Sequence, residues 1–387
     1  SAPPAWAQTC DLVSIAQAPD PVLADTTLRV GTEAYSYNEI RVSTQRTYSD
    51  VTKDIALRVL DLDTCQTEVV VISKTYNNPT LVKRTTIHQV TLSAPAGWTI
   101  KPLRRTNGIQ WNAWATEYEI IPPTRKTVIE VKYPVVENPG KKNQEVTFLT
   151  YTPHSSEVRT PEVVTSGVGY LTTVASRAYA ELRAQNVRSK AFPKMLVADI
   201  ASFNYNHQVR LALIEHLDMT EFVLDPSWTL QRLLTVVGLN REGTAGYTCS
   251  NASACGLMQF TAPTYKQVYA TYPSAKIIKD FSLGARDHLN SMKAAILLHD
   301  LNLASLIKAF GPNIANDPKL EEYLAAAYNT GVRRVINVVR AARAKRTQDW
   351  AQARGVQGLL AETKGYIAKL RYIASHPSPM RAVAKGE

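Results

Sequence analysis

The hydrophobic pattern of this 387-residue chain changes its period near the middle. Before about residue 151 the apolar runs are short and alternating or β-branched, as in residues 55–59, 69–72 and 127–131. From about Gly167 apolar residues recur every four positions, in Tyr170, Val174, Ala178 and Leu182, and then in Val209, Leu213 and Leu217. This change of period predicts a region of β-strands followed by a region of α-helices. The length, which exceeds that of a usual single domain, favours the same division.

The predicted fold class is α+β, with an N-terminal antiparallel β-sandwich-like domain followed by an α-helical domain. Turn signals separate the strand-like runs at Asn77-Asn78-Pro79, Asn107-Gly108 and Asn138-Pro139-Gly140. We expect a β-rich domain of unknown role over 1–155, a helical connector over 156–205, a helical domain over 206–376 and a frayed tail over 377–387.

The chain is basic, with a formal net charge of +11 and an isoelectric point near 9.4. This charge favours a polyanionic environment, such as nucleic acid or a cell wall with acidic peptides and polymers. No nucleic-acid-binding signature accompanies it, so we predict no nucleic-acid partner. No apolar run reaches 18 residues, so no transmembrane segment is predicted. The late basic cluster is expected to be a solvated helix face and comprises Arg333, Arg334, Arg340, Arg343, Lys345 and Arg346.

One amphipathic helix is predicted to carry an acid at its end. Asp225 and Pro226 are typical of an N-cap and a first-turn proline, and apolar residues then recur at helical spacing. The helix should end near Glu242, where Gly243 can take a left-handed conformation. A carboxyl held there beside apolar neighbours would lose hydration and keep its proton near neutral pH, as a general acid must. The alternative is an ordinary solvated residue at a helix end.

Three motifs follow this acid in the order Gly-Leu-Met-Gln, Ala-Tyr-Asn-Thr-Gly and Glu-Thr-Lys-Gly-Tyr. They begin at Gly256, Ala327 and Glu362. Together with Glu242-Gly243 and Ser250, this order resembles the soluble lytic transglycosylase catalytic domain of the goose-type lysozyme superfamily. Two departures mark the loop between acid and Gly-Leu-Met-Gln: the 14-position spacing is about one residue shorter than the family pattern, and Ser253 stands where the family has Gly.

The resemblance implies a lysozyme-like helical domain and a reaction with one acid/base carboxyl in place of the usual glycosidase pair. By position, Glu242 would protonate the glycosidic oxygen. The N-acetyl group of the substrate would stabilise the positive charge, and the 6-hydroxyl of the same muramic acid would attack. The expected substrate-side residues are Ser250, Met258, Gln259, Tyr328, Asn329, Glu362 and Tyr366, whose amides, hydroxyls and rings suit sugars and acetamides.

Several of these residues also have ordinary structural interpretations. Met258 is more often core packing than a substrate contact, and we retain it only as a possible floor of the cleft. Tyr328 lies on a predicted helix that begins at Asp317-Pro318, where it could be a core aromatic. Asn329 and Gly331 could simply end that helix.

The four cysteines divide evenly between the two regions. The simplest pairing joins Cys10 to Cys65 and Cys249 to Cys255, with the second bridge stiffening the loop after Glu242. Disulfides would imply an oxidising compartment, whereas free buried thiols would fit a reducing one. Neither a Cys-x-x-Cys nor a His-Glu-x-x-His spacing occurs, so no metal site or cofactor is predicted.

The resulting hypothesis is a peptidoglycan lytic transglycosylase that cleaves the MurNAc-GlcNAc β-1,4 bond and leaves 1,6-anhydroMurNAc ends. The alternatives are a hydrolytic goose-type lysozyme and an inactive glycan-binding structural protein. The expected partners are peptidoglycan glycan strands, together with a protein partner for the β-rich domain. Ala5-Trp6-Ala7 resembles the end of a signal peptide, which fits a periplasmic or extracellular location, and a phage particle is the alternative.

Overall fold

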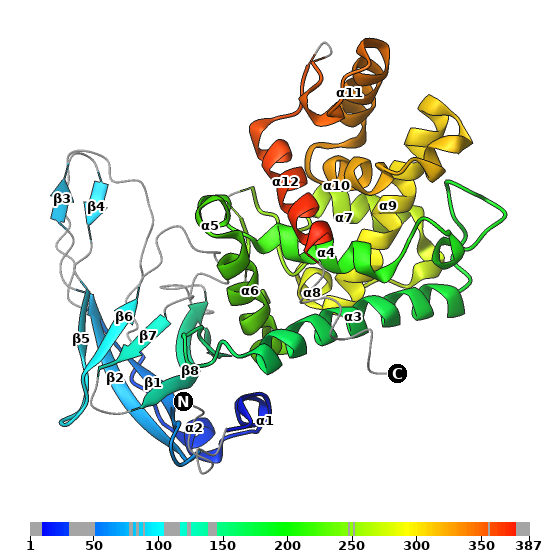
Figure 1. The fold of residues 1–387 in the computed structure, drawn as a ribbon. Coiled ribbons are helices and arrows are strands. Elements are labelled where there is room, and N and C mark those ends of the chain that lie inside the picture. Colours follow the sequence, from blue (N-terminus) through cyan, green and yellow to red (C-terminus); the bar gives the residue numbers. More distant parts are fainter. Residues whose placement is uncertain are drawn as a thin grey trace, which may run out of the picture. The chain divides into compact units, whose positions relative to one another are not determined.

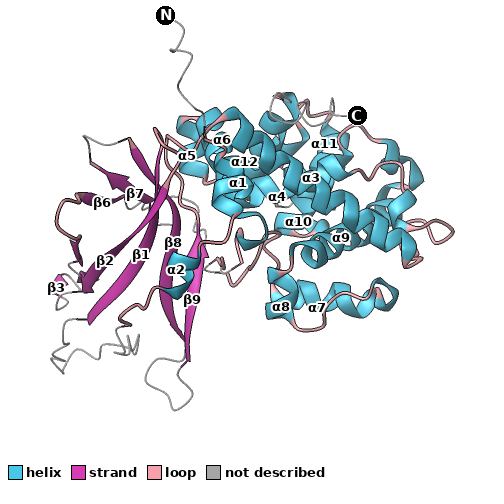
Figure 2. Ribbon diagram, turned by 90° about the horizontal axis from the view of Figure 1, so that it is seen from below, coloured by secondary structure: helices cyan, strands magenta, loops and turns pink. Residues whose placement is uncertain are grey.

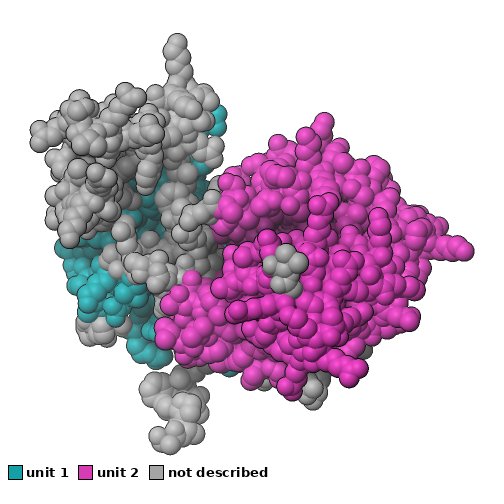
Figure 3. All heavy atoms as spheres, turned by 90° about the horizontal axis from the view of Figure 1, so that it is seen from above, with its two compact units in different colours: residues 1–105, 116–163 teal, residues 106–115, 164–387 magenta. Residues whose placement is uncertain are grey.

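The computed structural model describes residues 10–30, 51–76, 80–82, 85–87, 90–103, 117–121, 125–137, 145–246, 248–250, 252–354 and 357–376. Its described residues form two compact units, which Figure 3 colours separately, with the division between Val163 and Val164. The first unit holds the strands and the second holds nearly all of the helices (Figures 1 and 2). The predicted combination of antiparallel strands with a helical C-terminal part is confirmed.

The first unit is built on a five-stranded antiparallel sheet of order β5-β2-β1-β8-β9. The central strand β1 (Val51–Asp61) pairs with β2 (Thr67–Tyr76) and β8 (Lys126–Glu137), so the three sequence runs that predicted strands lie side by side. The edge strands are β5 (Val90–Ser93) and β9 (Glu145–Tyr151). Two further pairs join β3 (Thr80–Val82) to β4 (Thr85–Ile87) and β6 (Ile100–Leu103) to β7 (Glu117–Ile120).

Part of this sheet is covered by the short helix α2 (Pro21–Asp25), which follows α1 (Leu12–Gln17). Leu23 of α2 packs with Ala56 of β1. The Lys132 ammonium donates to three carbonyl oxygens at the end of α2, including that of Ala24 at 2.6 Å. Arg58 forms an ion pair with Asp20 at 2.8 Å. Buried cations therefore fasten the α2 segment to the sheet.

The finer prediction of a sandwich of two facing sheets remains a prediction. All three predicted turns lie outside the described residues. Trp98 is half-buried, with the Lys126 ammonium 4.9 Å from its ring centroid.

The second unit consists of ten α-helices and short 3₁₀ turns within the described range. The helices are α3 (Pro161–Ala184), α4 (Tyr205–His216), α5 (Met219–Leu224), α6 (Pro226–Asn240), α7 (Ala262–Thr271), α8 (Phe281–Arg286), α9 (His288–Phe310), α10 (Leu320–Thr330), α11 (Val332–Lys345) and α12 (Ala361–Ser375). One continuous apolar cluster joins residues from α3 to α12.

Most residues predicted as a separate connector, from Val164 onward, belong to this helical unit. Val174, Ala178 and Leu182 of α3 are buried in the same apolar cluster as α4, α6 and α9. The expected connector over 156–205 therefore needs correction. Its apolar stripe is long enough to pack as a core helix, which a spacing pattern alone does not reveal.

Helix α11 carries the basic cluster as a solvated face. Val335, Val338, Val339 and Ala342 are buried, whereas Arg333, Arg340, Arg343 and Lys345 are exposed. Both predicted disulfides are present, Cys10–Cys65 and Cys249–Cys255, and they fit an oxidising compartment. Among the described helices none is long and apolar enough to cross a membrane. The tail over 377–387 lies outside the described residues.

Candidate functional site

Glu242 follows the end of α6, close to where the sequence predicted it. The Asp225 carboxylate caps the helix by accepting from the Trp228 amide, and Pro226 occupies the first turn. The helix ends at Asn240, and Glu242 lies in a 3₁₀ turn, Arg241–Gly243, with its side chain exposed. The expected apolar surroundings are therefore absent, because the tight turn directs this residue toward solvent.

The backbone reversal at this helix end falls on a different residue from the one predicted. Arg241, with φ of 44° and ψ of −118°, ends α6, whereas Gly243 is not among the residues of positive φ. A non-glycine residue in this region is strained by roughly 1–3 kcal/mol. The packing around the turn must therefore compensate for the conformation of Arg241.

A buried hydrogen-bonded chain supports the turn that carries Glu242. His288 at the start of α9 donates from Nε2 to the Thr244 carbonyl at 2.7 Å, which leaves Nδ1 to accept from the Tyr170 hydroxyl at 2.7 Å. Burial lowers the pKa of His288, so the ring stays neutral, as this chain requires. Burial, and secondly the negative charge of Glu242, raise the pKa of Tyr170.

The loop after Glu242 is closed on itself by the disulfide between Cys249 and Cys255. The Ser250 hydroxyl accepts from the amides of Ala252 and Ala254, both at 3.2 Å. Ser253, which replaces the family glycine, has a left-handed backbone with φ of 58°. Ser250 is exposed, and in this structure its hydroxyl oxygen stabilises the loop.

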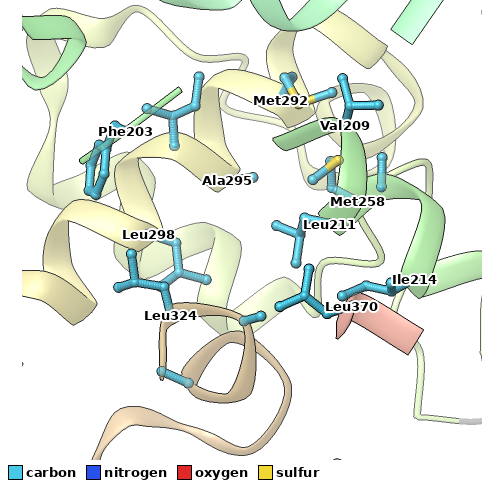
Figure 4. Close-up of a cluster of buried hydrophobic side chains, with 14 of the residues drawn as sticks. Phe203, Val209, Leu211, Ile214, Met258, Met292, Ala295, Leu298, Leu324 and Leu370 are labelled. Carbon is cyan, nitrogen blue, oxygen red and sulfur yellow. The ribbon is translucent and has the colours of Figure 1, made fainter. Parts of the chain in front are cut away.

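The Gly-Leu-Met-Gln segment forms a tight turn that packs on the core. Gly256 has φ of 76°, and a Cβ atom there would lie 1.9 Å from the Ala285 carbonyl oxygen, so glycine is required. Gln259 donates from Nε2 to the Gly256 carbonyl at 2.8 Å. Met258 is fully buried among the core residues labelled in Figure 4. Its predicted role as a substrate contact is therefore replaced by core packing beneath the turn.

The structure brings the three later motifs into direct contact. Tyr328 donates its hydroxyl to the Met258 carbonyl at 2.6 Å, which joins Ala-Tyr-Asn-Thr-Gly to Gly-Leu-Met-Gln. Asn329 donates from Nδ2 to Glu362 at 3.2 Å and accepts from the Thr363 hydroxyl at 2.7 Å. These bonds join the ends of α10 and α12. Motifs far apart in sequence thus form one cluster, with Glu362 exposed and Asn329 half-buried.

The ordinary structural roles predicted for Gly331 and Tyr328, as a helix end and a core aromatic, are also found. Gly331, with φ of 87°, ends the helix, and the Tyr328 ring packs edge-on against Phe260 and His299. The helix begins at Leu320 and not at Asp317-Pro318, because the Asp317 carboxylate accepts from the Lys319 amide within a preceding turn. Tyr328 therefore supports the cluster from the core side.

Sequence reasoning missed a second acid, Glu215, in the last turn of α4. Tyr366, the tyrosine of Glu-Thr-Lys-Gly-Tyr, is buried and donates its hydroxyl to Glu215 Oε1 at 2.6 Å. Lys369, on the same helix, donates to the carbonyl oxygens of Ile214 and Leu217 and lies close enough for its charge to act on Glu215. Ile214 and Leu370 are both labelled in Figure 4, where the contact between α4 and α12 can be followed.

The environment of Glu215 favours its protonated form. Burial raises its pKa to about 7, against the opposing effects of the Tyr366 hydrogen bond and the Lys369 charge. Burial and the nearby Glu215 carboxyl also raise the pKa of Tyr366 and that of Tyr328, so both phenols stay protonated. Glu215 is nevertheless half-buried and not fully enclosed.

Glu242 and Glu215 thus occupy different surroundings. Glu242 acts electrostatically on Tyr170 and His288, whereas Glu215 and Glu362 act on Tyr366. No hydrogen bond or ion pair joins Glu242 to the motif cluster within the described part of the chain. One signal could have indicated Glu215: a lone acid directly after the apolar run Leu211-Ala212-Leu213-Ile214, all of which is buried.

Within the described residues, no group of three or more His, Cys, Asp or Glu side chains is arranged to hold a metal ion. Comparison of the chain with models of protein families, with curated proteins and with solved structures found no match.

Proposed function

We propose that this protein is a peptidoglycan lytic transglycosylase that cleaves the β-1,4 bond between N-acetylmuramic acid and N-acetylglucosamine. The observation that carries the proposal is the contact of the three motifs through Met258, Tyr328, Asn329 and Thr363. A chance resemblance of short motifs gives no reason for them to meet in space. A functional constellation requires that they do.

The residues at this cluster have the chemistry that a glycan substrate needs. Asn329 and Gln259 carry amide groups, and Glu362 is an exposed acceptor, all suited to sugar hydroxyls and acetamides. Buried Tyr328 and Tyr366 hold the backbone and an acid in place. Ser250 would act through the loop that it stabilises.

The reaction needs a protonated carboxyl beside the glycosidic oxygen. General acid catalysis contributes on the order of 10² to 10⁴-fold to rate. Once the C1–O bond breaks, the muramic acid 6-hydroxyl attacks C1 and returns its proton to the carboxylate, so no water enters the product. Motif position makes Glu242 the first candidate for this acid.

The experiment is digestion of purified peptidoglycan with the full chain, followed by mass spectrometry of the released fragments. We expect 1,6-anhydro ends. Reducing ends would instead support the hydrolytic alternative, in which a second carboxylate positions water. Failure to release any fragment would refute cleavage and leave the glycan-binding alternative. The substitution Asn329→Ala removes both hydrogen bonds from α10 to α12. This variant should cleave peptidoglycan more slowly, because the motifs on these two helices are then no longer joined.

The cell envelope is the setting that this function requires. The two disulfides and the basic charge are compatible with an exported protein that acts on an acidic wall. We propose a periplasmic or extracellular location, with a phage particle as the alternative. The β-rich unit would bind a protein partner or orient the helical unit on the wall.

A further inference from the structure

The turn that carries Glu242 has an unfavourable backbone conformation on both sides of the acid. Arg241 has φ of 44° and Ala245 has φ of 56°, a region that residues other than glycine rarely adopt. Glu242 itself is exposed between them. Such a conformation persists only where neighbouring parts of the structure impose it, and it is common where function needs a fixed geometry.

One side chain from another helix holds this turn. His288, at the start of α9, donates from Nε2 to the Thr244 carbonyl at 2.7 Å. Within the part of the chain that the structure describes, this is the only hydrogen bond that reaches residues 241–246 from another helix. Thr244 is buried, and the exclusion of water strengthens the bond. The place of the turn relative to α9 therefore depends on His288.

Tyr170 of α3 fixes the orientation of the His288 ring. The Thr244 carbonyl can only accept, so the ring proton is on Nε2, and Nδ1 accepts from the Tyr170 hydroxyl at 2.7 Å. The two rings also meet edge to face, with their centroids 5.8 Å apart. A flipped His288 ring would break both bonds. The Tyr170 hydroxyl therefore selects the one ring orientation that holds the turn.

This pair lies outside the segments that resemble the lytic transglycosylases. Helix α3 precedes the region of the motifs, and His288 stands between the second and third of them in the chain. Apolar residues such as Leu171 and Val174 already pack α3 into the core, whereas the bond from Tyr170 leads only to the turn. The charge of Glu242 acts on both rings, so the pair is close to the acid.

We propose that Tyr170 and His288 are positioning residues for Glu242, which hold its carboxyl at the glycosidic oxygen by fixing the turn. This proposal rests on the proposed function, with Glu242 as the acid. There the carboxyl gives a proton to the glycosidic oxygen as the C1–O bond breaks. It regains one from the muramic acid 6-hydroxyl as that oxygen bonds to C1. Both transfers need hydrogen-bond distance, so a displaced turn slows both.

The deciding experiment compares Tyr170→Phe with Tyr179→Phe in the full chain, with soluble peptidoglycan strands as substrate. Tyr179 is the matched control, because it is a buried tyrosine of the same helix whose hydroxyl donates to the Asn204 carbonyl, away from the turn. We expect Tyr170→Phe to lower kcat by about 10-fold or more, as for a misplaced catalytic group. KM should stay unchanged, because the substrate-side motif cluster is intact. Tyr179→Phe should keep the kcat of wild type.

Substitutions of His288 test the second member of the pair. His288→Ala leaves both the Thr244 carbonyl and the Tyr170 hydroxyl without a partner, whereas His288→Gln keeps an amide donor and an acceptor. We expect His288→Ala to lower kcat and His288→Gln to restore part of it. Circular dichroism and thermal melting check folding. If His288→Ala does not fold, Tyr170→Phe still decides the matter, because it removes one oxygen atom only.

Hydrogen–deuterium exchange of the folded variants gives a readout that does not depend on activity. The Thr244 and Thr248 amides bond to carbonyls of the turn itself, those of Arg241 and Ala245. Tyr170→Phe should speed exchange over 241–248, because the turn loses its fixed support. Tyr179→Phe should leave exchange in this segment unchanged.

The possible failures are distinguishable. If wild type releases no fragment from peptidoglycan, the proposed function fails and the catalytic role of the pair fails with it. If wild type cleaves and Tyr170→Phe has the kcat of Tyr179→Phe, this proposal alone is overturned. A loss that appears only in KM, or unchanged exchange over 241–248 in Tyr170→Phe, also overturns it. So does a folded His288→Ala variant that is as active as wild type.

Discussion

Helices α4 and α6 each have an acid near the C-terminal end, but the two acids lie in different environments. These acids are Glu215 in the last turn of α4 and Glu242 two residues beyond α6. The partial negative charge of a helix C-terminus disfavours a carboxylate at either place. At α4, however, α12 covers the helix end and removes water, whereas at α6 the 3₁₀ turn leaves the acid in solvent. Packing, more than position along a helix, decides how far each acid is separated from water.

The largest expected effect on stability concerns Gly256 in the Gly-Leu-Met-Gln turn. In Gly256→Ala, the new Cβ would clash with the Ala285 carbonyl and require a left-handed alanine, so we expect a loss of about 3 kcal/mol or more in the free energy of unfolding. Gly243→Ala is the control beside Glu242, where a Cβ meets nothing within 4 Å. Urea denaturation measures both. Equal losses would mean that the two turns are equally constrained.

The next largest effect is a pH dependence of the free energy of unfolding that arises from Glu215. Folding raises the pKa of Glu215 from about 4.5 to about 7, so the folded state binds more protons between these values. Its contribution to stability is therefore highest below about pH 4.5 and declines up to about pH 7. The difference in unfolding free energy between Glu215→Gln and wild type should shift in favour of the variant over this range. A difference that stays constant with pH would contradict the buried environment.

A smaller effect is expected from the loop after Glu242. Replacing Cys249 and Cys255 by Ser removes a short crosslink, for which chain entropy predicts a loss of about 2 kcal/mol. Because the loop follows Glu242, the first candidate for the acid, the double variant should also cleave more slowly at a temperature where it is folded. Fragment release measures the activity and chemical denaturation the stability. Unchanged activity in the folded variant would mean that the disulfide does not help to position the site.

The smallest effect is expected from removing a single hydroxyl. Tyr328→Phe leaves the Met258 carbonyl without its partner, which should cost about 1 kcal/mol in unfolding free energy. Tyr170→Phe removes the corresponding bond to His288 on the Glu242 side. We expect similar losses of stability for the two variants, measured by urea denaturation. Clearly unequal losses would mean that one of the two turns is held mainly by other contacts.

The sequence alone determined the main division and much of the local structure of this protein. Alternating or β-branched runs identified β1, β2 and β8, and four-residue spacing identified α3 and α4, because these patterns reflect which residues of an element are buried. Asp225-Pro226 indicated the start of α6, and the pairing predicted for the four cysteines is the one found. The motif order also indicated which residues would gather.

Only the tertiary structure decided how those residues are surrounded. The exposure of Glu242, the burial of Met258 and the inclusion of α3 in the helical core depend on contacts between segments distant in sequence. Glu215 lies 151 positions from Tyr366, and no local pattern predicts their hydrogen bond. The tendency of a carboxyl to keep its proton depends on water, charge and hydrogen bonds around it, and these are set when α4 packs on α12.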